Sequence, residues 1–260
     1  MTEELKNKLI FLADKYESSN FITNDPCLFT HKYKNTTDAE VSSFIAANLA
    51  FGQRKQILNH LNKIFMQIEL KNKSPSQWIL TEEYKNFFPD NNISFYRMFT
   101  NHSMNLMFDT LKKILIENKS LGSACKKLYL NAQNENSPLH LSQLICSLFP
   151  EECNLIPHTK TSACKRINLF LRWMVRDNSP VDLGLWKWFD KKNLLIPLDI
   201  HVLKESVNLG LINKTSNGKI PAATIKIARQ LTDKMSKIWP NDPVKADFAL
   251  FGYGIDHKTN

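Results

Sequence analysis

Hydrophobic residues recur along nearly the whole chain at the spacing of an α-helix, and alternating, strand-like patterns are almost absent. The pattern therefore predicts an all-α protein. The expected helices cover residues 2–17, 38–51, 54–70, 94–116, 121–131, 138–148, 160–176, 182–189, 200–209, 221–237 and 243–253. The expected loops are the polar clusters at 71–76, 89–92, 131–138 and 214–219. None of these loops is long enough for a clear interdomain linker, so residues 1–260 are expected to form a single unit.

A single carboxylate, Asp199, ends the apolar run Leu195–Leu198 and begins a helical apolar stripe that continues to Leu211. This position is typical of an N-cap, where the side chain accepts hydrogen bonds from the first amides of the helix and contributes roughly 1 kcal/mol. Capping alone explains the residue. A carboxylate held at a helix start, with a cationic segment upstream, is also a plausible place for chemistry.

The cationic segment contains Lys160, between threonines and a serine that predict a helix start. A cation is disfavoured at this end of a helix by the macrodipole. A lysine in such a place can be more readily deprotonated and act as an amine nucleophile through a Schiff base. The alternative is an ordinary solvated lysine. Lys165, five residues later, lies on a different azimuth of the same expected helix.

Four segments together resemble the helix-hairpin-helix (HhH-GPD) DNA glycosylase superfamily. Lys160–Ala163 is similar to its Lys-Thr-x-Ala motif, and Leu198–Val202 is similar to its Val-Asp-Thr-His-Val segment. Asn48–Arg54 is similar to a helix that ends near a functional glutamine, and Lys245–Gly252 to the helix that closes the fold. The chain is most similar to an uncharacterised bacterial branch and more distantly to the archaeal 8-oxoguanine DNA glycosylases.

The resemblance covers approximately residues 35–255, with the hairpin-like and catalytic segment at 155–211. It implies two interdigitated helical lobes with a cleft between them. It also implies that Lys160 attacks the deoxyribose C1′ while Asp199 stabilises the developing positive charge and assists proton transfer. Lys165 is the alternative nucleophile. No metal or organic cofactor is implied.

Two departures from the superfamily pattern stand out. The usual Leu-Pro-Gly-x-Gly hairpin is replaced by Leu155–Thr159, which has no glycine, and an extra segment at about 177–193 separates the lysine from the aspartate. Glycine permits the tight turn and the close approach of backbone to phosphate. Its loss puts the usual phosphate clamp in doubt and leaves the choice between Lys160 and Lys165 open.

Several other residues are candidates for DNA contact. A glutamine such as Gln53 can fill the gap left by an extruded base or pair with the orphaned partner base, and Arg54 follows it. An ordinary polar residue at a helix junction is the alternative. Lys165, Arg172 and Arg176 form a stripe that could follow a DNA backbone or simply be a solvated face. The remaining candidates for DNA contact are His158, Thr159 and His201.

Two aromatic clusters with interleaved cations have the composition that stacks bases and holds phosphates. In Phe95–Phe99, the spacing favours a core role for the two phenylalanines and leaves Tyr96 or Arg97 for a ligand. In Trp186–Phe189, Trp186 could wall a base pocket. Either cluster could instead belong to the core.

Composition agrees with a polyanionic partner but is less specific. The chain has 34 Lys and Arg against 25 Asp and Glu, a net charge of +9. Its five cysteines are an odd, irregular set that predicts neither a disulfide framework nor a zinc site. His158 and His201 lack a third ligand at helical spacing, so no metal site is expected. No apolar run approaches the roughly 20 residues of a membrane span, and we expect a cytoplasmic, nucleoid-associated monomer.

The resemblance thus implies a base-excision repair enzyme that flips a damaged base, such as 8-oxoguanine, out of double-stranded DNA and excises it. Schiff-base AP lyase activity is expected to accompany excision. The main alternative is a non-catalytic helical DNA-binding protein on a glycosylase-like scaffold. An RNA- or protein-binding helical adaptor would explain the charge but would leave the Leu198–Val202 match to chance.

Overall fold

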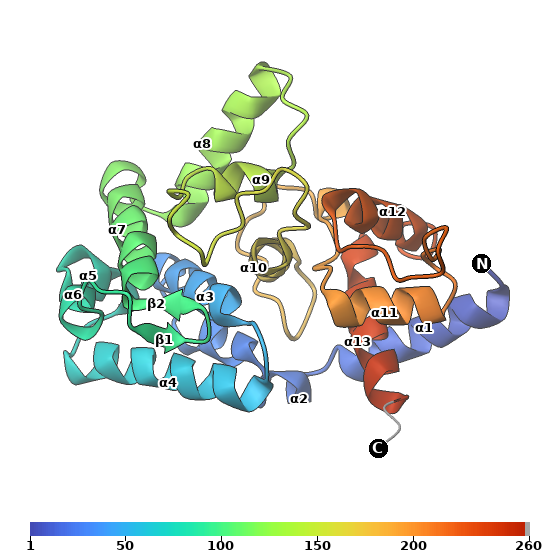
Figure 1. The fold of residues 1–260 in the computed structure, drawn as a ribbon, viewed down its shortest axis with the longest axis horizontal. Helices are drawn as coiled ribbons and strands as arrows, with labels where there is room; N and C mark the ends of the chain where they lie inside the picture. The colour runs from blue at the N-terminus through green and yellow to red at the C-terminus, as the bar shows by residue number, and fades with distance from the viewer. Residues whose placement is uncertain (258–260) are drawn as a thin grey trace. The chain divides into compact units, whose positions relative to one another are not determined.

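The computed structural model describes residues 1–257 and is mostly helical, with two short strands (Figure 1). The prediction of an α-helical protein is confirmed in this sense. The chain divides into two compact units. The middle unit is Asn24–His158, and the terminal unit combines Met1–Thr23 with the chain from Thr159 onward. Among the described residues, no helix is both long and apolar enough to cross a membrane.

The middle unit contains one short hairpin among helices. Its elements are η1 (Pro26–Lys32), α3 (Thr36–Leu49), α4 (Arg54–Leu70), α5 (Pro75–Leu80), α6 (Glu83–Phe87), β1 (Ser94–Tyr96), β2 (Phe99–Thr100), α7 (Asn101–Asn118), α8 (Leu121–Asn134) and α9 (Leu141–Cys146). The helices expected at 38–51 and 54–70 correspond to α3 and α4. Helices α5 and α6 lie in a region where no helix was expected.

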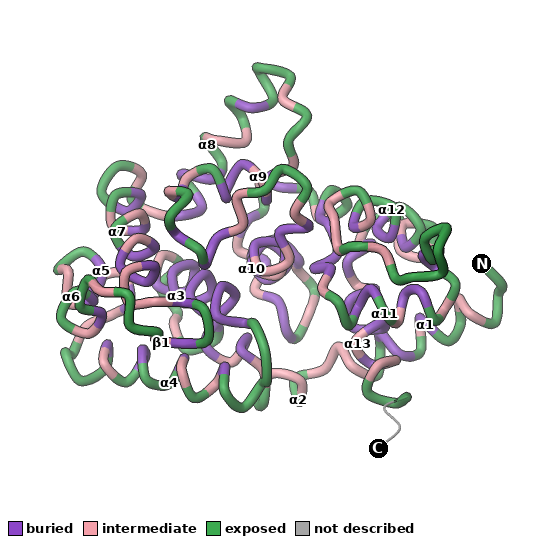
Figure 2. Tube along the Cα trace, in the orientation of Figure 1, coloured by how far each residue is buried: buried purple, intermediate pink, exposed green. Residues whose placement is uncertain are grey.

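Helix α3 is the buried centre of the middle unit, drawn almost wholly purple in Figure 2. Its many small and apolar side chains allow η1, α4, α5 and α8 to pack against it. The Asn35 side chain caps its start by accepting a hydrogen bond from the Asp38 amide, 3.2 Å away. The buried Glu40 carboxylate accepts a hydrogen bond from the Gly122 amide at 3.0 Å, so this polar group has a partner.

The terminal unit is built from both ends of the chain. Its elements are α1 (Glu3–Tyr16), α2 (Ser19–Ile22), α10 (Lys165–Val175), η2 (Lys191–Asn193), α11 (Ile200–Asn208), α12 (Ile225–Met235), η3 (Pro243–Lys245) and α13 (Ala246–Asp256). Helices α1 and α13 pack side by side (Figure 1). A Cβ at Gly252 would lie only 2.1 Å from the Tyr16 ring, so glycine permits this close approach.

Three of the expected helices are corrected by the structure. Residues 94–100 form the β1–β2 hairpin, whose turn places Arg97 at φ +54°. The helix expected from 160 begins only at Lys165, because Cys164 before it has a left-handed φ of +46°. No helix forms at 182–189. There the Leu183 and Trp186 amides donate to carbonyls of α10 residues, so this segment lies along α10 as an extended chain with turns.

Candidate active site

Lys165 and Asp199 form a half-exposed pair at the starts of two helices of the terminal unit. Lys165 is the first residue of α10, and its Nζ lies 3.8 Å from Asp199 Oδ2. The Asp199 Oδ1 accepts hydrogen bonds from the His201 and Val202 amides, both at 2.9 Å. The predicted N-cap is therefore confirmed. One carboxylate oxygen caps α11 while the other faces the lysine.

The pair is accessible to solvent and stands where helix dipoles act on it. The Lys165 side chain is 27% exposed and the Asp199 side chain 34% exposed. The positive end of a helix dipole favours an anion such as Asp199 and disfavours a cation such as Lys165. Asp199 therefore supplies a compensating charge for Lys165. An amine beside a carboxylate, reachable from solvent, has the composition needed for nucleophilic attack with assisted proton transfer.

Lys160 lies outside the helix that was expected to contain it. It is exposed in a turn, five residues before α10 begins. The following residues join this loop to the start of α12: Ser162 pairs with Thr224, and the Ile225 amide donates to the Thr161 carbonyl at 3.0 Å. The helix-dipole argument made for Lys160 therefore applies instead to Lys165, which occupies the first position of α10.

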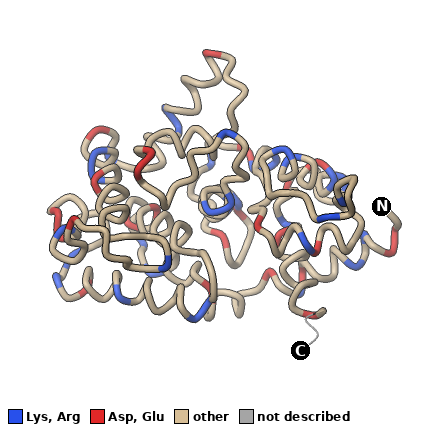
Figure 3. Tube along the Cα trace, viewed as in Figure 1, with Lys and Arg blue, Asp and Glu red and all other residues tan. Residues whose placement is uncertain are grey.

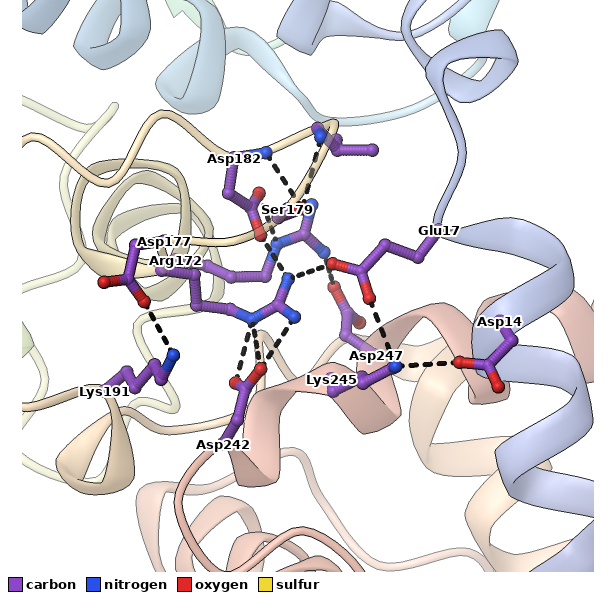
Figure 4. Close-up of polar contacts among 12 residues, drawn as sticks. Asp14, Glu17, Arg172, Asp177, Ser179, Asp182, Lys191, Asp242, Lys245 and Asp247 are labelled. Carbon is purple, nitrogen blue, oxygen red and sulfur yellow. Dashed lines mark hydrogen bonds and ion pairs between the residues drawn. The ribbon is translucent and has the colours of Figure 1, made fainter.

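Arg172 and Arg176 do not form a basic stripe on the surface. Their side chains are only 3% and 2% exposed. The expected phosphate-binding role for these two residues is wrong, because their guanidinium groups bind carboxylates inside the terminal unit and are not available to a DNA backbone. The partners are the residue that follows α1, a residue of the chain after α10, the residue that precedes η3 and a residue of α13, as Figure 4 shows.

The buried arginines and their carboxylates form one connected network. Arg172 Nε lies 3.2 Å from Asp182 Oδ1, and Arg172 also binds Asp247. Arg176 binds Asp182, Glu17 at 2.9 Å and Asp242 at 2.8 Å. Burial opposes the charge on Arg176, but its bonds with Asp242 and the other carboxylates outweigh burial and raise its pKa. We call these six residues the arginine cluster.

The remaining candidates of the terminal unit occupy varied positions. His201 is exposed in the first turn of α11, and Thr159 is exposed before the Lys160 turn. Trp186 is buried, with its ring 5.2 Å from Phe170 and 5.4 Å from Trp188 between centroids. Trp186 is therefore a core residue, and its expected role as the wall of a base pocket is corrected.

In the middle unit, the structure brings together two segments that the sequence analysis treated separately. The Tyr96 hydroxyl donates to the Phe51 carbonyl at 2.5 Å, and the Arg97 guanidinium carbon lies 4.8 Å from the centroid of the Phe51 ring. Gly52, at φ +107°, allows this approach, since a Cβ there would lie 2.6 Å from Arg97 Nη1. We call this contact between the Phe51–Arg54 loop and the β1–β2 hairpin the loop–hairpin cluster.

Within the loop–hairpin cluster, the exposed side chains are those that can meet a ligand. Arg97 and Gln53 are exposed, whereas Tyr96 is buried with its hydroxyl engaged and its pKa raised by burial. Tyr96 is therefore corrected from a base-contacting residue to a support for the loop. Gln53 occupies the N-cap position of α4, and the Arg54 guanidinium lies 4.0 Å from the Asp25 carboxylate. His158 is half-buried at the end of this unit.

The sequence analysis missed the acidic members of the arginine cluster. Asp247 lies inside the Lys245–Gly252 motif, where it interrupts an apolar run, and Asp182 directly follows buried Val181. A carboxylate within an apolar run is a signal of a buried charge that needs a partner. Within the described chain, no three His, Cys, Asp or Glu side chains gather as a metal site would require.

The fold and the site thus define a mostly helical protein with a lysine–aspartate pair where two helices begin. A family model matches residues 25–256, and its description is protein of unknown function (DUF2400). Because the match spans most of the 260 residues, the chain belongs to the DUF2400 family. No curated protein and no solved structure matches the chain.

Proposed function

We propose that the protein is a DNA glycosylase that removes a damaged base, an oxidised purine such as 8-oxoguanine, from double-stranded DNA. The observation that carries the proposal is the half-exposed pair of Lys165 and Asp199 at the starts of α10 and α11. A purely structural cap would need Asp199 but no lysine facing its second oxygen. The resemblance to the HhH-GPD glycosylases supplies the reaction class.

In the proposed reaction, Lys165 is the nucleophile and Lys160 the alternative. Asp199 accepts a proton from the Lys165 ammonium, and the resulting amine attacks the deoxyribose C1′. The bond between C1′ and the base breaks, the base leaves with the bonding electrons, and the proton held by Asp199 passes to the base, so that Asp199 is a carboxylate again. The carboxylate also stabilises positive charge that develops on the sugar. The sugar ring then opens to a Schiff base. Loss of a C2′ proton breaks the C3′–O bond and nicks the strand.

Exposed cations of the terminal unit support a polyanionic partner. Figure 3 shows Lys and Arg on α11 and α12. Lys226 and Arg229 are exposed on α12, and Lys160 is exposed on the loop joined to the start of that helix. Such side chains, rather than the buried Arg172 and Arg176, are the ones we propose for phosphate contacts.

The proposal also includes the glycosylase type of two-lobed fold and association with the nucleoid. The division of the chain into two helical units is compatible with that fold type. In the middle unit, the loop–hairpin cluster presents Gln53 and Arg97 on its surface. We assign Gln53 the pairing with the orphaned base and Arg97 a contact with DNA, because an amide both donates and accepts hydrogen bonds and a guanidinium binds phosphate.

Borohydride trapping tests the proposal. Purified protein is incubated with labelled duplexes that carry 8-oxoguanine, uracil, an alkylated purine or an abasic site. We expect a covalent adduct that depends on the lesion and falls at least about 100-fold in Lys165→Gln, since the nucleophile is gone. Lys160→Gln is the matched control, a lysine five residues away in an exposed turn, and should keep the adduct.

Each other outcome has a defined meaning. Loss of the adduct only in Lys160→Gln would move the nucleophile to Lys160. No adduct and no base release with any duplex would contradict the enzyme and favour the non-catalytic DNA-binding protein. Preference for RNA in a competition with duplex DNA would favour the adaptor. Unfolding measurements on both variants distinguish loss of chemistry from loss of fold.

A further inference from the structure

Asn168 is a buried residue at the end of the first turn of α10, close to the lysine of the candidate site. It is 0% exposed, and its side-chain Nδ2 donates to the Ala163 carbonyl at 2.8 Å, which lies before the helix begins. The Asn168 backbone amide donates to the Cys164 carbonyl, also at 2.8 Å. Asn168 therefore binds the carbonyls of the two residues that directly precede Lys165.

These bonds hold a turn that a residue with a side chain rarely adopts. Cys164 has a left-handed φ of +46°, which costs free energy in any residue but glycine, so the surrounding contacts must hold it. With a right-handed φ, Cys164 would extend α10 toward Lys160, as the local sequence predicts. In such a helix the Ala163 carbonyl would accept the Ile167 amide, whereas here it accepts the Asn168 side chain. The Asn168 side chain thus competes with a longer helix.

The start of α10 decides what lies beside the Lys165 amine. Side chains of an α-helix point back over the preceding turn. Because α10 begins at Lys165, no helical turn lies there, and the lysine Nζ comes to 3.8 Å from the Asp199 carboxylate. A longer helix would place Thr161 and Ser162, four and three residues earlier, next to the lysine side chain. It would also move the positive end of the helix dipole away from the pair.

We propose that Asn168 is a positioning residue of the Lys165–Asp199 site, whose side-chain bond to the Ala163 carbonyl makes α10 begin at Lys165 and so directs the lysine amine toward Asp199. The consequence for catalysis rests on the proposed function. The effect on the turn does not, because the conformation of Cys164 can be measured without DNA. Leucine separates this role from simple packing, because it has nearly the size of asparagine but no hydrogen to donate.

The first measurement reports φ at Cys164 by NMR of protein made with isotope-labelled cysteine, which gives signals from only five residues. A strong NOE between the amide and α-protons of one residue indicates a positive φ. We expect this NOE at Cys164 in the wild type and its loss in Asn168→Leu. Asn105→Leu is the matched control and should keep it. Asn105 is also buried, on α7 of the middle unit, and its side-chain amide donates to the Phe88 carbonyl.

The second measurement is the rate of the borohydride adduct. Asn168→Leu should form it at least about 10-fold more slowly at saturating DNA, because the amine is misplaced. The DNA concentration that gives half the maximal rate should change less than about twofold, because the phosphate contacts remain. Adding Cys164→Gly to Asn168→Leu should restore most of the rate, since glycine adopts the left-handed turn without the penalty of a side chain. A loss caused by packing would instead deepen, because Cys164 is buried.

Several outcomes would overturn the proposal. A strong Cys164 NOE in Asn168→Leu would show that the turn does not depend on the Asn168 side chain. Loss of this NOE in Asn105→Leu as well would show that any buried substitution has the same effect. If Asn168→Leu does not fold, hydrogen exchange of the Asn168 side-chain amide in the wild type replaces it. Exchange as fast as that of a solvated amide would contradict the bond to Ala163.

The two proposals can fail separately. Loss of the Cys164 NOE in Asn168→Leu, without trapping of the wild type on any duplex, would keep the role of Asn168 in the turn and reject the glycosylase. Trapping that depends on Lys165, combined with an Asn168→Leu variant that traps as fast as the wild type, would keep the enzyme and reject Asn168 as a positioning residue.

Discussion

Helix α10 carries cations toward both of its ends, and their surroundings differ. At the first residue, Lys165 is partly exposed and faces one carboxylate oxygen at 3.8 Å. Seven and eleven residues later, Arg172 and Arg176 are buried among four carboxylates of the arginine cluster. An exposed, loosely paired lysine contributes little to stability but can exchange its proton and react. A buried guanidinium with several partners is fixed in place and is not a nucleophile.

The comparison separates the residues that fold the terminal unit from those that we propose to act on DNA. Basic side chains at helical spacing look alike in the sequence. In the structure, the carboxylates of Glu17, Asp182, Asp242 and Asp247 decide which of them are buried. The arginine cluster also connects the end of α1 to α10, because Glu17 directly follows α1 and its partner Arg176 directly follows α10. Three experiments test this contrast.

The first experiment concerns the stability of the fold, where we expect the greatest change. Arg176→Met removes the buried cationic partner of Glu17 and Asp242 and leaves Asp182 with Arg172 alone, so we expect a loss of about 3–5 kcal/mol in the free energy of unfolding. Urea denaturation measures the loss. Lys187→Met is the matched control, because Lys187 pairs with Asp177 on the surface with a side chain that is 67% exposed. That control should lose less than about 1 kcal/mol.

A loss below about 1 kcal/mol in Arg176→Met as well would contradict the contrast between the two ends of α10. It would mean that the carboxylates of the arginine cluster are solvated or protonated once the guanidinium is gone. Adding Asp242→Asn to Arg176→Met should recover part of the loss, since it removes one of the uncompensated charges.

The second experiment separates two contributions of Asp199, its role as a helix cap and its negative charge. Asparagine caps helices about as well as aspartate, so Asp199→Asn should change the free energy of unfolding by less than about 0.5 kcal/mol, whereas Asp199→Ala should lose about 1 kcal/mol. Both variants lack the charge that faces Lys165, and both should reduce borohydride trapping at least about 100-fold. A large, equal loss of stability in both variants would place this pair in the same class as the arginine cluster.

The sequence predicts the long amphipathic helices and the Asp199 cap because these features depend on local spacing and local hydrogen bonds. Helix α4 has the expected bounds of 54–70, and Asp199 makes the expected bonds to its own helix. The predicted start of α10 at residue 160 was wrong, because the threonines and serine there are typical of a helix N-terminus but precede a loop. The left-handed Cys164 and the pairing of Ser162 with Thr224 fix the actual start, and the second of these depends on residues about sixty positions away.

The burial of Arg172 and Arg176 was not predicted for a similar reason. Three of their four carboxylate partners are separated from them by more than sixty residues or lie near the N-terminus. A hydrophobic pattern reports which face of a helix is apolar, but it does not report which distant acids arrive at the other face. The loop–hairpin cluster is also a long-range contact, between residues 51–54 and 96–97.

The smallest expected effect concerns the surface ion pairs of Asp177, close to the buried cluster in sequence. Hydrogen bonds from Lys191 and Lys187 lower the pKa of the Asp177 carboxyl to about 2. A carboxyl with a lowered pKa stabilises the fold above the pKa of its unfolded state, near 3.9, and loses this contribution as the pH falls toward 2. The difference in the free energy of unfolding between wild type and Asp177→Asn should therefore be largest at pH 7 and should shrink from pH 4 downward. We expect this difference to stay below about 1 kcal/mol, because the carboxyl group is solvated.

Urea denaturation from pH 7 to pH 3 measures this gap, and two lysine variants sharpen it. Lys191→Met should narrow the gap more than Lys187→Met, because Lys191 Nζ lies 2.6 Å from the carboxylate and is less exposed, whereas Lys187 Nζ lies at 3.1 Å. A gap that stays constant with pH would show that Asp177 acts through packing or backbone conformation rather than charge. A difference of several kcal/mol would mean that these surface ion pairs stabilise the fold as strongly as the buried arginine cluster. It would contradict the distinction between exposed and buried ion pairs.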